Sequence, residues 1–207
     1  VVNKIRYKLT RKFKYKKLKV GHAGTLDPLA TGLLIICTGK ATRVIEKIQG
    51  ADKEYIATIE LGKTTPSSDL ETEIDATYPV KHISKELLKE VMKKFKGEIE
   101  QVPPMFSAKK KNGIRAYELA RKGIEITMQP VHVRIETLEL TDFQPPHATF
   151  RVICSKGTYI RALARDIGLA AESGAYLKKL TRTSSGPFKI DKAITINEFE
   201  NQLNRLE

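Results

Sequence analysis

Cysteine is scarce in this 207-residue sequence, tryptophan is absent, and no apolar run is long. Cys37 and Cys154 both lie in apolar, strand-like segments, and two such cysteines support neither a disulfide framework nor a cysteine-type zinc site. We expect both to be buried thiols. The strongest apolar run, residues 33–37, is far shorter than the roughly 20 residues of a membrane-spanning helix. The first residues scatter their apolar side chains among lysines and form no signal-peptide core, which predicts a cytoplasmic protein without a membrane span.

Proline and glycine are also few, with 9 and 13 residues. Their scarcity excludes collagen-like and low-complexity chains, and 41% hydrophobic with 29% charged residues is typical of a globular protein. The length is sufficient for a buried core that needs no cross-links. The sequence shows no internal repeat. We expect one domain over residues 1–207 and a monomeric protein.

Acidic residues are missing from residues 1–19, although this segment holds nine of the 37 basic side chains. The rest of the chain carries only +4 of the total charge of +13. So dense a positive segment repels itself unless an anion screens it, which indicates a nucleic-acid backbone as partner. The alternative is a solvated basic helix face. Ile5, Leu9 and Phe13 recur at four-residue steps and predict an amphipathic helix here. The candidate phosphate contacts are Lys12, Lys16 and Lys17.

Periodicity and turn residues predict a mixture of helices and strands. We expect helices over residues 41–49, 85–96, 114–122, 158–170 and 196–206. We expect strands over residues 33–38, 55–61, 131–140 and 150–154. Leu138 and Leu140 fall out of phase with Ile135, which indicates a bulge between them. Because no regular strand–helix–strand repeat emerges, the order predicts an α+β fold with a mixed, largely antiparallel sheet flanked by helices.

Two segments contain candidate chemistry. Asp27 lies in a glycine-flanked loop, residues 21–28, before a buried strand, where a rigid scaffold can leave a carboxylate reachable. The alternative is a structural turn, because Asp before Pro commonly starts one. In residues 154–161 a strand leads through Gly157 into a helix, and Arg161 lies one turn inside that helix. It could reach a neighbouring loop, or it could be a surface arginine.

Taken together, these segments and others in the same order closely resemble the signature of the TruB family, the bacterial tRNA pseudouridine synthases that act on the T-arm uridine. The matching segments are residues 21–34 (GHAGTLDPLATGLL), 39–42 (GKAT), 52–55 (DKEY), 65–69 (TPSSD), 101–108 (QVPPMFSA), 117–121 (YELAR), 154–161 (CSKGTYIR), 166–168 (DIG), 174–177 (GAYL) and 180–183 (LTRT). The resemblance spans about residues 1–199.

The resemblance implies a role for each matching residue. Asp27 corresponds to the nucleophilic aspartate, Tyr55 to the aromatic ring that packs against the flipped uracil, and Arg161 to the ion-pair partner of Asp27. Tyr159 and Leu177 correspond to other residues lining that pocket. Taken alone, the alternation of Tyr55 with the inward residues of its strand favours a core position.

His22 corresponds to a histidine that contacts the refolded T-loop, although a lone loop histidine is often structural. The lysine run 109–111 follows a matching segment, so we expect Lys109 to contact phosphate, with a solvated turn as the alternative.

The resemblance also implies the pseudouridine synthase fold, a central RNA-binding cleft and a tRNA T stem-loop as partner. The reaction breaks the N1–C1′ bond of uridine, rotates the uracil and rejoins it through C5, steps in which no metal or redox cofactor has a task. We therefore expect no cofactor and no metal site. Two alternatives are a non-catalytic RNA-binding or tRNA-folding module, and a glycosidase-like hydrolase. The latter would need two cooperating carboxylates, and the motifs supply one.

The sequence departs from the family pattern at both ends. Family members usually begin with a Lys-Pro-x-Gly-x-Ser/Thr-Ser strand, whereas this sequence opens at Val1-Val2-Asn3. Many bacterial members also carry a C-terminal RNA-binding domain of the PUA type, whereas this sequence stops at Glu207. We expect a pseudouridine synthase catalytic domain over residues 1–207 that lacks both elements.

Overall fold

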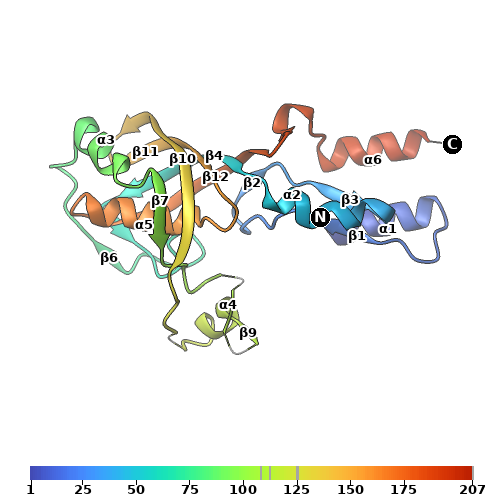
Figure 1. Cartoon of the computed structure of the whole chain (residues 1–207), viewed down its shortest axis with the longest axis horizontal. Helices are drawn as coiled ribbons and strands as arrows, with labels where there is room; N and C mark the ends of the chain where they lie inside the picture. The colour runs from blue at the N-terminus through green and yellow to red at the C-terminus, as the bar shows by residue number, and fades with distance from the viewer. Residues whose placement is uncertain (108, 112, 125, 207) are drawn as a thin grey trace.

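The computed structural model describes residues 1–107, 109–111, 113–124 and 126–206. Its centre is a seven-stranded sheet in the order β13-β12-β4-β11-β10-β7, with β2 paired to β12 off this path (Figure 1). All neighbouring strands of this sheet are antiparallel except β2 and β12. The strands are β2 (Thr31–Gly32), β4 (Lys53–Leu61), β7 (Gly97–Gln101), β10 (Val131–Gln144), β11 (His147–Cys154), β12 (Ala175–Ser185) and β13 (Phe188–Lys189). The predicted α+β class with a largely antiparallel sheet is confirmed.

Helices and short hairpins surround this sheet. The helices are α1 (Val2–Lys12), η1 (Gly39–Val44), α2 (Ile45–Gly50), α3 (Lys85–Lys93), α4 (Ala116–Ala120), α5 (Ile160–Ala170), η2 (Ile190–Lys192) and α6 (Ile196–Arg205). The remaining strands pair as β1 (Val20–His22) with β3 (Ile36–Thr38), β5 (Lys63–Thr64) with β6 (Ala76–Thr77), and β8 (Lys110–Lys111) with β9 (Ile114–Arg115). No helix within the described residues is long and apolar enough to cross a membrane.

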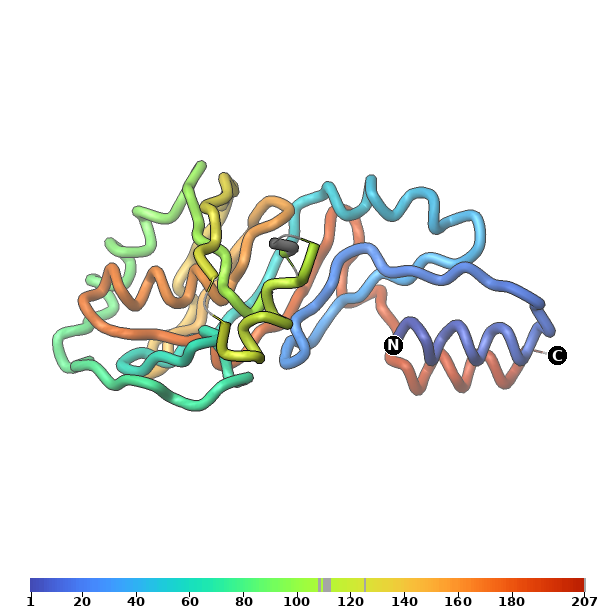
Figure 2. The backbone as a smooth tube through the Cα atoms, turned by 90° about the horizontal axis from the view of Figure 1, so that it is seen from below, coloured from blue at the N-terminus to red at the C-terminus, as the bar shows by residue number. Residues whose placement is uncertain are grey.

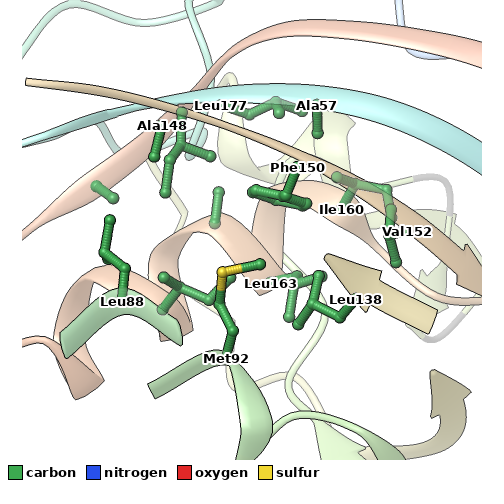
Figure 3. Packing of buried hydrophobic residues seen from close by; sticks show 14 of the residues in the cluster. Ala57, Leu88, Met92, Leu138, Ala148, Phe150, Val152, Ile160, Leu163 and Leu177 are labelled. Atoms are coloured by element: carbon green, nitrogen blue, oxygen red, sulfur yellow. The ribbon is translucent and has the colours of Figure 1, made fainter. Parts of the chain in front are cut away.

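The apolar core lies where α3 and α5 pack on the sheet and on each other. Figure 3 shows Leu88 and Met92 of α3 gathered with Leu163 of α5 and Phe150 of β11. Burying each such side chain contributes roughly 1.5–3 kcal/mol, so this cluster fixes α5 against the sheet. The start of α5 is thereby fixed as well, and Arg161 lies there.

Strand phase follows the predicted pattern. The register of β10 and β11 shifts between Ile135 and Thr137, so that Ile135 and Leu138 are both buried. This is the predicted bulge. The other register shifts, among them one between Leu177 and Lys179 of β12, were not predicted from the sequence. Cys37 and Cys154 are buried free thiols, as expected.

The two ends of the chain form a separate region. Figures 1 and 2 show α1 and α6 side by side at the end of the molecule opposite α3. Lys4 and Lys8 of α1 form ion pairs with Glu200 of α6, at 2.9 and 3.6 Å. A capping box at Thr195 opens α6.

Several predicted boundaries are wrong; for example, the strand predicted over residues 33–38 begins only at Ile36, and the helix predicted over 85–96 ends at Lys93. The amphipathic pattern predicts that the N-terminal helix includes Phe13, but α1 ends at Lys12, and Lys14 takes a left-handed φ of 52°. The predicted loop 21–28 starts inside β1, because Gly21 pairs with Cys37. The predicted helix 114–122 shrinks to α4. Each error involves a partner strand or a missing core contact that local periodicity does not reveal.

Candidate active site

Asp27 lies in the loop that joins β1 to β2, residues 23–30. The Ala23 N–H donates to the Ile35 carbonyl at 2.9 Å and the Ala30 N–H donates to the Asp27 carbonyl at 3.0 Å. These bonds shape the loop from inside and anchor it to the segment before β3. The Asp27 side chain remains 35% exposed. A fixed backbone thus presents a partly solvated carboxylate.

Arg161, at the start of α5, grips this carboxylate with two parallel hydrogen bonds. Its Nε donates to Oδ2 of Asp27 at 2.9 Å and its Nη2 donates to Oδ1 at 3.0 Å. The carbonyls of Phe106 and Ser67 accept further bonds from the guanidinium, at 3.0 and 3.4 Å. With only 4% of its side chain exposed, Arg161 is fixed in a planar geometry that lysine cannot reproduce. The predicted ion pair is present.

A second carboxylate, Asp69, also faces Arg161. Its Oδ2 lies 3.5 Å from the Arg161 Nε, and its side chain is 5% exposed. Its Oδ1 accepts the Glu71 N–H at 2.9 Å. The motifs predicted one carboxylate here, and the structure corrects the count to two. Residues 65–69 already belonged to a matching motif, but nothing in the motif showed that Asp69 would meet Arg161.

Asp27 and Asp69 line one side of a small pocket. The other residues around it are Leu29, Ala30, Leu177, Lys178, Lys179 and Leu180. Leu177 is buried, and the register shift of β12 turns both Leu177 and Leu180 to the face of the sheet that carries Ile59 and Ala57. Leu177 therefore lines the same pocket as Asp27.

Tyr55 and Tyr159 are both half-buried, and the charge of the Asp27 carboxylate acts on both phenols. Burial raises the pKa of Tyr55 to about 12; the nearby Asp27 carboxylate adds to this rise and the Arg182 guanidinium opposes it. Burial also raises the pKa of Tyr159. Both phenols therefore remain neutral hydrogen-bonding groups at neutral pH. Tyr55 comes from the predicted inward phase of β4.

The backbone at Tyr159 is held by Gln101, a residue whose role was not predicted from the sequence. The Gln101 side chain accepts the Tyr159 N–H at 2.8 Å and donates to the Tyr159 carbonyl at 3.1 Å. Gln101 is fully buried at the end of β7. It therefore fixes the residue before α5, and through it the start of the helix that carries Arg161.

His22 is half-buried in β1 and not in a loop. Its Nδ1 is buried without a hydrogen-bond partner among the described residues. Its carbonyl accepts a long hydrogen bond of 3.5 Å from Gln49. The structure thus places His22 five residues before Asp27, on the strand that leads into the Asp27 loop.

The predicted basic contacts lie on two segments. Lys12 ends α1, and Lys16 and Lys17 are exposed in the segment that follows it. Lys109 is half-buried next to the β8–β9 hairpin, and its carbonyl accepts the Ala116 N–H at 2.7 Å. Figure 1 shows β9 and α1 as separate projections from the sheet. Among the described residues no cluster of three or more His, Cys, Asp or Glu side chains could hold a metal ion.

Comparisons with known proteins account for nearly the whole chain. A family model described as "TruB family pseudouridylate synthase (N terminal domain)" matches residues 10–160. A second model, "tRNA pseudouridylate synthase B C-terminal domain", matches residues 161–207. The boundary between the two falls inside α5, and β12 from the second pairs with β4 from the first. The two matched segments therefore share one sheet.

Individual relatives agree with these matches. A tRNA pseudouridine synthase B of Phocaeicola vulgatus is 56% identical over all of this chain and 88% of its own length. That of Flavobacterium johnsoniae is 53% identical over 98% of this chain and 89% of its own length. A solved chain from "Crystal Structure of a Cbf5-Nop10-Gar1 Complex" has a TM-score of 0.71 and 30% identity, covering 96% of this chain and 50% of that one. The chain belongs to the TruB family of tRNA pseudouridine synthases.

Proposed function

We propose that the chain isomerises the T-loop uridine at position 55 of tRNA to pseudouridine, with Asp27 as the nucleophilic carboxylate. The observation that carries the proposal is the two-bond grip of Arg161 on Asp27. An arginine in this geometry fixes the direction of the carboxylate through two charge-assisted hydrogen bonds. Asp27 keeps 35% of its side chain exposed, so a substrate can reach it.

The reaction is an isomerisation, so its atoms balance without a co-substrate. The N1–C1′ bond of uridine breaks, the uracil turns, C5 bonds to C1′, the C5 proton leaves and N1 gains a proton. Asp27 assists the first step by attacking the sugar or by removing a proton from it, and both routes need its carboxylate ionised. Arg161 and the carbonyls behind it keep that carboxylate in one orientation throughout.

Aromatic and apolar side chains beside Asp27 suit a flipped base. A uridine must leave its stack to reach Asp27, at a cost of a few kcal/mol. Stacking on an aromatic face offsets this cost by about 1–3 kcal/mol per base. We assign that stacking to Tyr55, and the walls of the base pocket to Tyr159 and Leu177. The raised pKa values keep both phenols uncharged beside the base.

The basic segments suit the phosphates of the T stem-loop. Lys4 and Lys8 already bind Glu200, whereas Lys12, Lys16 and Lys17 are exposed and form no ion pair among the described residues. We assign phosphate contacts to these three lysines and to Lys109. His22 precedes the Asp27 loop on β1 and is only half-buried, so we assign to it a contact with the T-loop.

The Asp27→Asn variant tests the proposal. We expect pseudouridine formation on an unmodified tRNA transcript to fall by more than about 1,000-fold, because the nucleophile is lost. Binding should persist, since the change removes a negative charge next to a polyanion. The control is Asp142→Asn, at an exposed position of β10. Asp27→Asn activity within tenfold of wild type, after deamidation is excluded by mass spectrometry, would overturn the assignment.

A further inference from the structure

Arg182 of β12 is the largest fully buried side chain, only 1% exposed, and it has no part in the roles proposed so far. Its Nε donates to the Leu33 carbonyl at 2.8 Å and its Nη2 donates to the Gly24 carbonyl at 3.1 Å. Gly24 precedes Asp27 by three residues and Leu33 follows it by six. One guanidinium thus binds the chain on both sides of Asp27.

The backbone of Arg182 binds the same loop. Gly32 of β2 pairs with Arg182, and the Leu33 N–H donates to the Arg182 carbonyl at 2.8 Å. Gly32 has a φ of +101°, and a Cβ there would lie 2.3 Å from the Arg182 carbonyl oxygen. Gly24 has a φ of +115°, and a Cβ there would lie 3.3 Å from Nη1 of Arg182. Glycine at both positions lets the loop approach Arg182 this closely.

Arg182 also lies next to Tyr55. The two residues are opposite each other in the register of β12 and β4. The positive charge of the guanidinium opposes the rise in the pKa of the Tyr55 phenol that burial causes. One buried side chain therefore interacts with both the loop of the proposed nucleophile and the ring of the proposed stacking residue.

The charge of Arg182 has no acidic partner among the residues that the structure describes. Arg161 binds Asp27 and Asp69, but no ion pair joins Arg182 to a carboxylate within the described part of the chain. Removing a cation from water is costly, and an apolar side chain would fill the space without that cost. What an apolar side chain cannot supply is a rigid set of donors that reaches two carbonyls at once.

We propose that Arg182 is a positioning residue that clasps both sides of the Asp27 loop and holds it in register with Tyr55. The inference rests on the proposed function, from which Asp27 and Tyr55 take their roles. Arg182 touches no substrate; it acts through the loop. Lysine would keep the charge but replace the planar set of donors with one flexible ammonium group, so the loop would lose one of its two anchors.

The first test compares Arg182→Lys with Arg151→Lys in the full chain, acting on a tRNA transcript. Arg151 lies on the other face of the sheet, between Glu54 and Glu139. We expect kcat to fall by about 100-fold in Arg182→Lys, as for an active group displaced by about 1 Å, with KM nearly unchanged. Arg151→Lys should keep kcat. Thermal melts must show both variants folded, because a purely structural role would lower the melting temperature and leave kcat of the folded protein intact.

A second variant, Gly24→Ala, disturbs the clasp from the loop side. Gly97→Ala is its control, since Gly97 has a φ of +92° and nothing lies within 4 Å of an added Cβ. Gly24→Ala should lower kcat, and combining it with Arg182→Lys should add little, because both variants disturb the same interaction. Losses that multiply in the double variant, or single-variant kcat values within about threefold of wild type, would overturn the proposal.

These outcomes separate the two proposals. If Asp27→Asn is inactive while the folded Arg182→Lys variant keeps its kcat, only the clasp is wrong. If Asp27→Asn is active, the proposed function is wrong whatever the Arg182 variants do. If Arg182→Lys does not fold, Gly24→Ala against Gly97→Ala still decides whether the interaction supports kcat.

Discussion

Two regions of the molecule each hold one arginine between two carboxylates, but the two arginines differ in burial and in their contacts with the backbone. At the candidate active site, Arg161 lies between Asp27 and Asp69. On the opposite face of the sheet, Arg151 of β11 lies between Glu54 and Glu139, with ion-pair distances of 2.6 and 3.2 Å. Arg151 is directly opposite Glu139 in the strand register, away from the core residue Phe150.

Burial and backbone contacts separate the two groups. The Arg161 side chain is 4% exposed, whereas the Arg151 side chain is 35% exposed. Two backbone carbonyls fix the Arg161 guanidinium, so it has one orientation. Water screens the Arg151 group, and such exposed pairs contribute about 0–1 kcal/mol. The surroundings, not the identity of the charges, therefore make an arginine–carboxylate pair suitable for chemistry.

Substitution of arginine by lysine should distinguish the two arginines most clearly, because it should affect kcat at only one of them. Arg161→Lys should lower kcat by about 100-fold, because lysine keeps the charge but cannot hold Asp27 through two parallel bonds. Arg151→Lys should leave kcat unchanged. Single-turnover pseudouridine formation at saturating enzyme measures both. Near-normal kcat in Arg161→Lys would show that charge alone suffices at the active site.

Low pH should destabilise the protein by protonating carboxylates on the outer face of the sheet, of which Glu60 is the example. Burial opposes ionisation of Glu60, but hydrogen bonds from Lys178, Lys63 and Tyr176 outweigh burial and lower its pKa from 4.5 to about 2. The unfolded chain therefore binds the proton first, so this stabilisation is complete above pH 4.5 and is lost as the pH falls toward 2. By pH 3 the loss should reach about 2 kcal/mol.

Urea unfolding at pH 5.5 and pH 3 measures this loss, and Glu60→Gln is the variant that should lack it. The difference between wild type and Glu60→Gln isolates this residue from other carboxylates. If both proteins lose equal free energy of unfolding between the two pH values, the stabilisation does not come from Glu60.

Double-mutant cycles measure how strongly each arginine is coupled to its carboxylate. Arg161→Ala leaves a carboxylate unpaired in a poorly solvated site, so the Arg161–Asp27 pair should show a coupling above about 1 kcal/mol. The Arg151–Glu139 pair should show about 0.2–1 kcal/mol. The free energy of unfolding in urea is the measurement for both cycles. Additive losses at Arg161 and Asp27 would mean that the two residues do not stabilise each other.

The smallest expected effect is on the salt dependence of tRNA binding, where lysines that form an ion pair within the protein should differ from lysines that do not. Neutralising Lys12, Lys16 and Lys17 should flatten the slope of log K against log salt concentration by about 0.7–0.9 for each phosphate that these lysines neutralise. Lys4 and Lys8 already pair with Glu200, so the Lys4→Gln/Lys8→Gln variant should change the slope less. Titration of tRNA binding at several salt concentrations measures both. An unchanged slope in the triple variant would place the RNA elsewhere.

Local features were predictable from sequence because they depend on near neighbours. Ser84 accepts the Leu87 N–H at the start of α3, as expected of a helix-capping serine. The bulge after Ile135 follows from a change of strand phase. The end of α1 was not predictable, because nothing in the lysine-rich pattern shows where packing against α6 stops. The motifs identified the family, and with it the ion-pair partner of Asp27.

The sequence by itself determined the class of elements, the family and the residue types available for chemistry. The tertiary structure alone decided which of them meet. Asp27 and Arg161 are separated by 134 residues, and the loop of Asp27 meets Arg182 across 149 to 158 residues. Asp69 joins them although its own segment predicts only a loop. Periodicity and caps depend on a few neighbouring residues, whereas these contacts exist only because burial of the core fixes α5, β12 and the Asp27 loop in one arrangement.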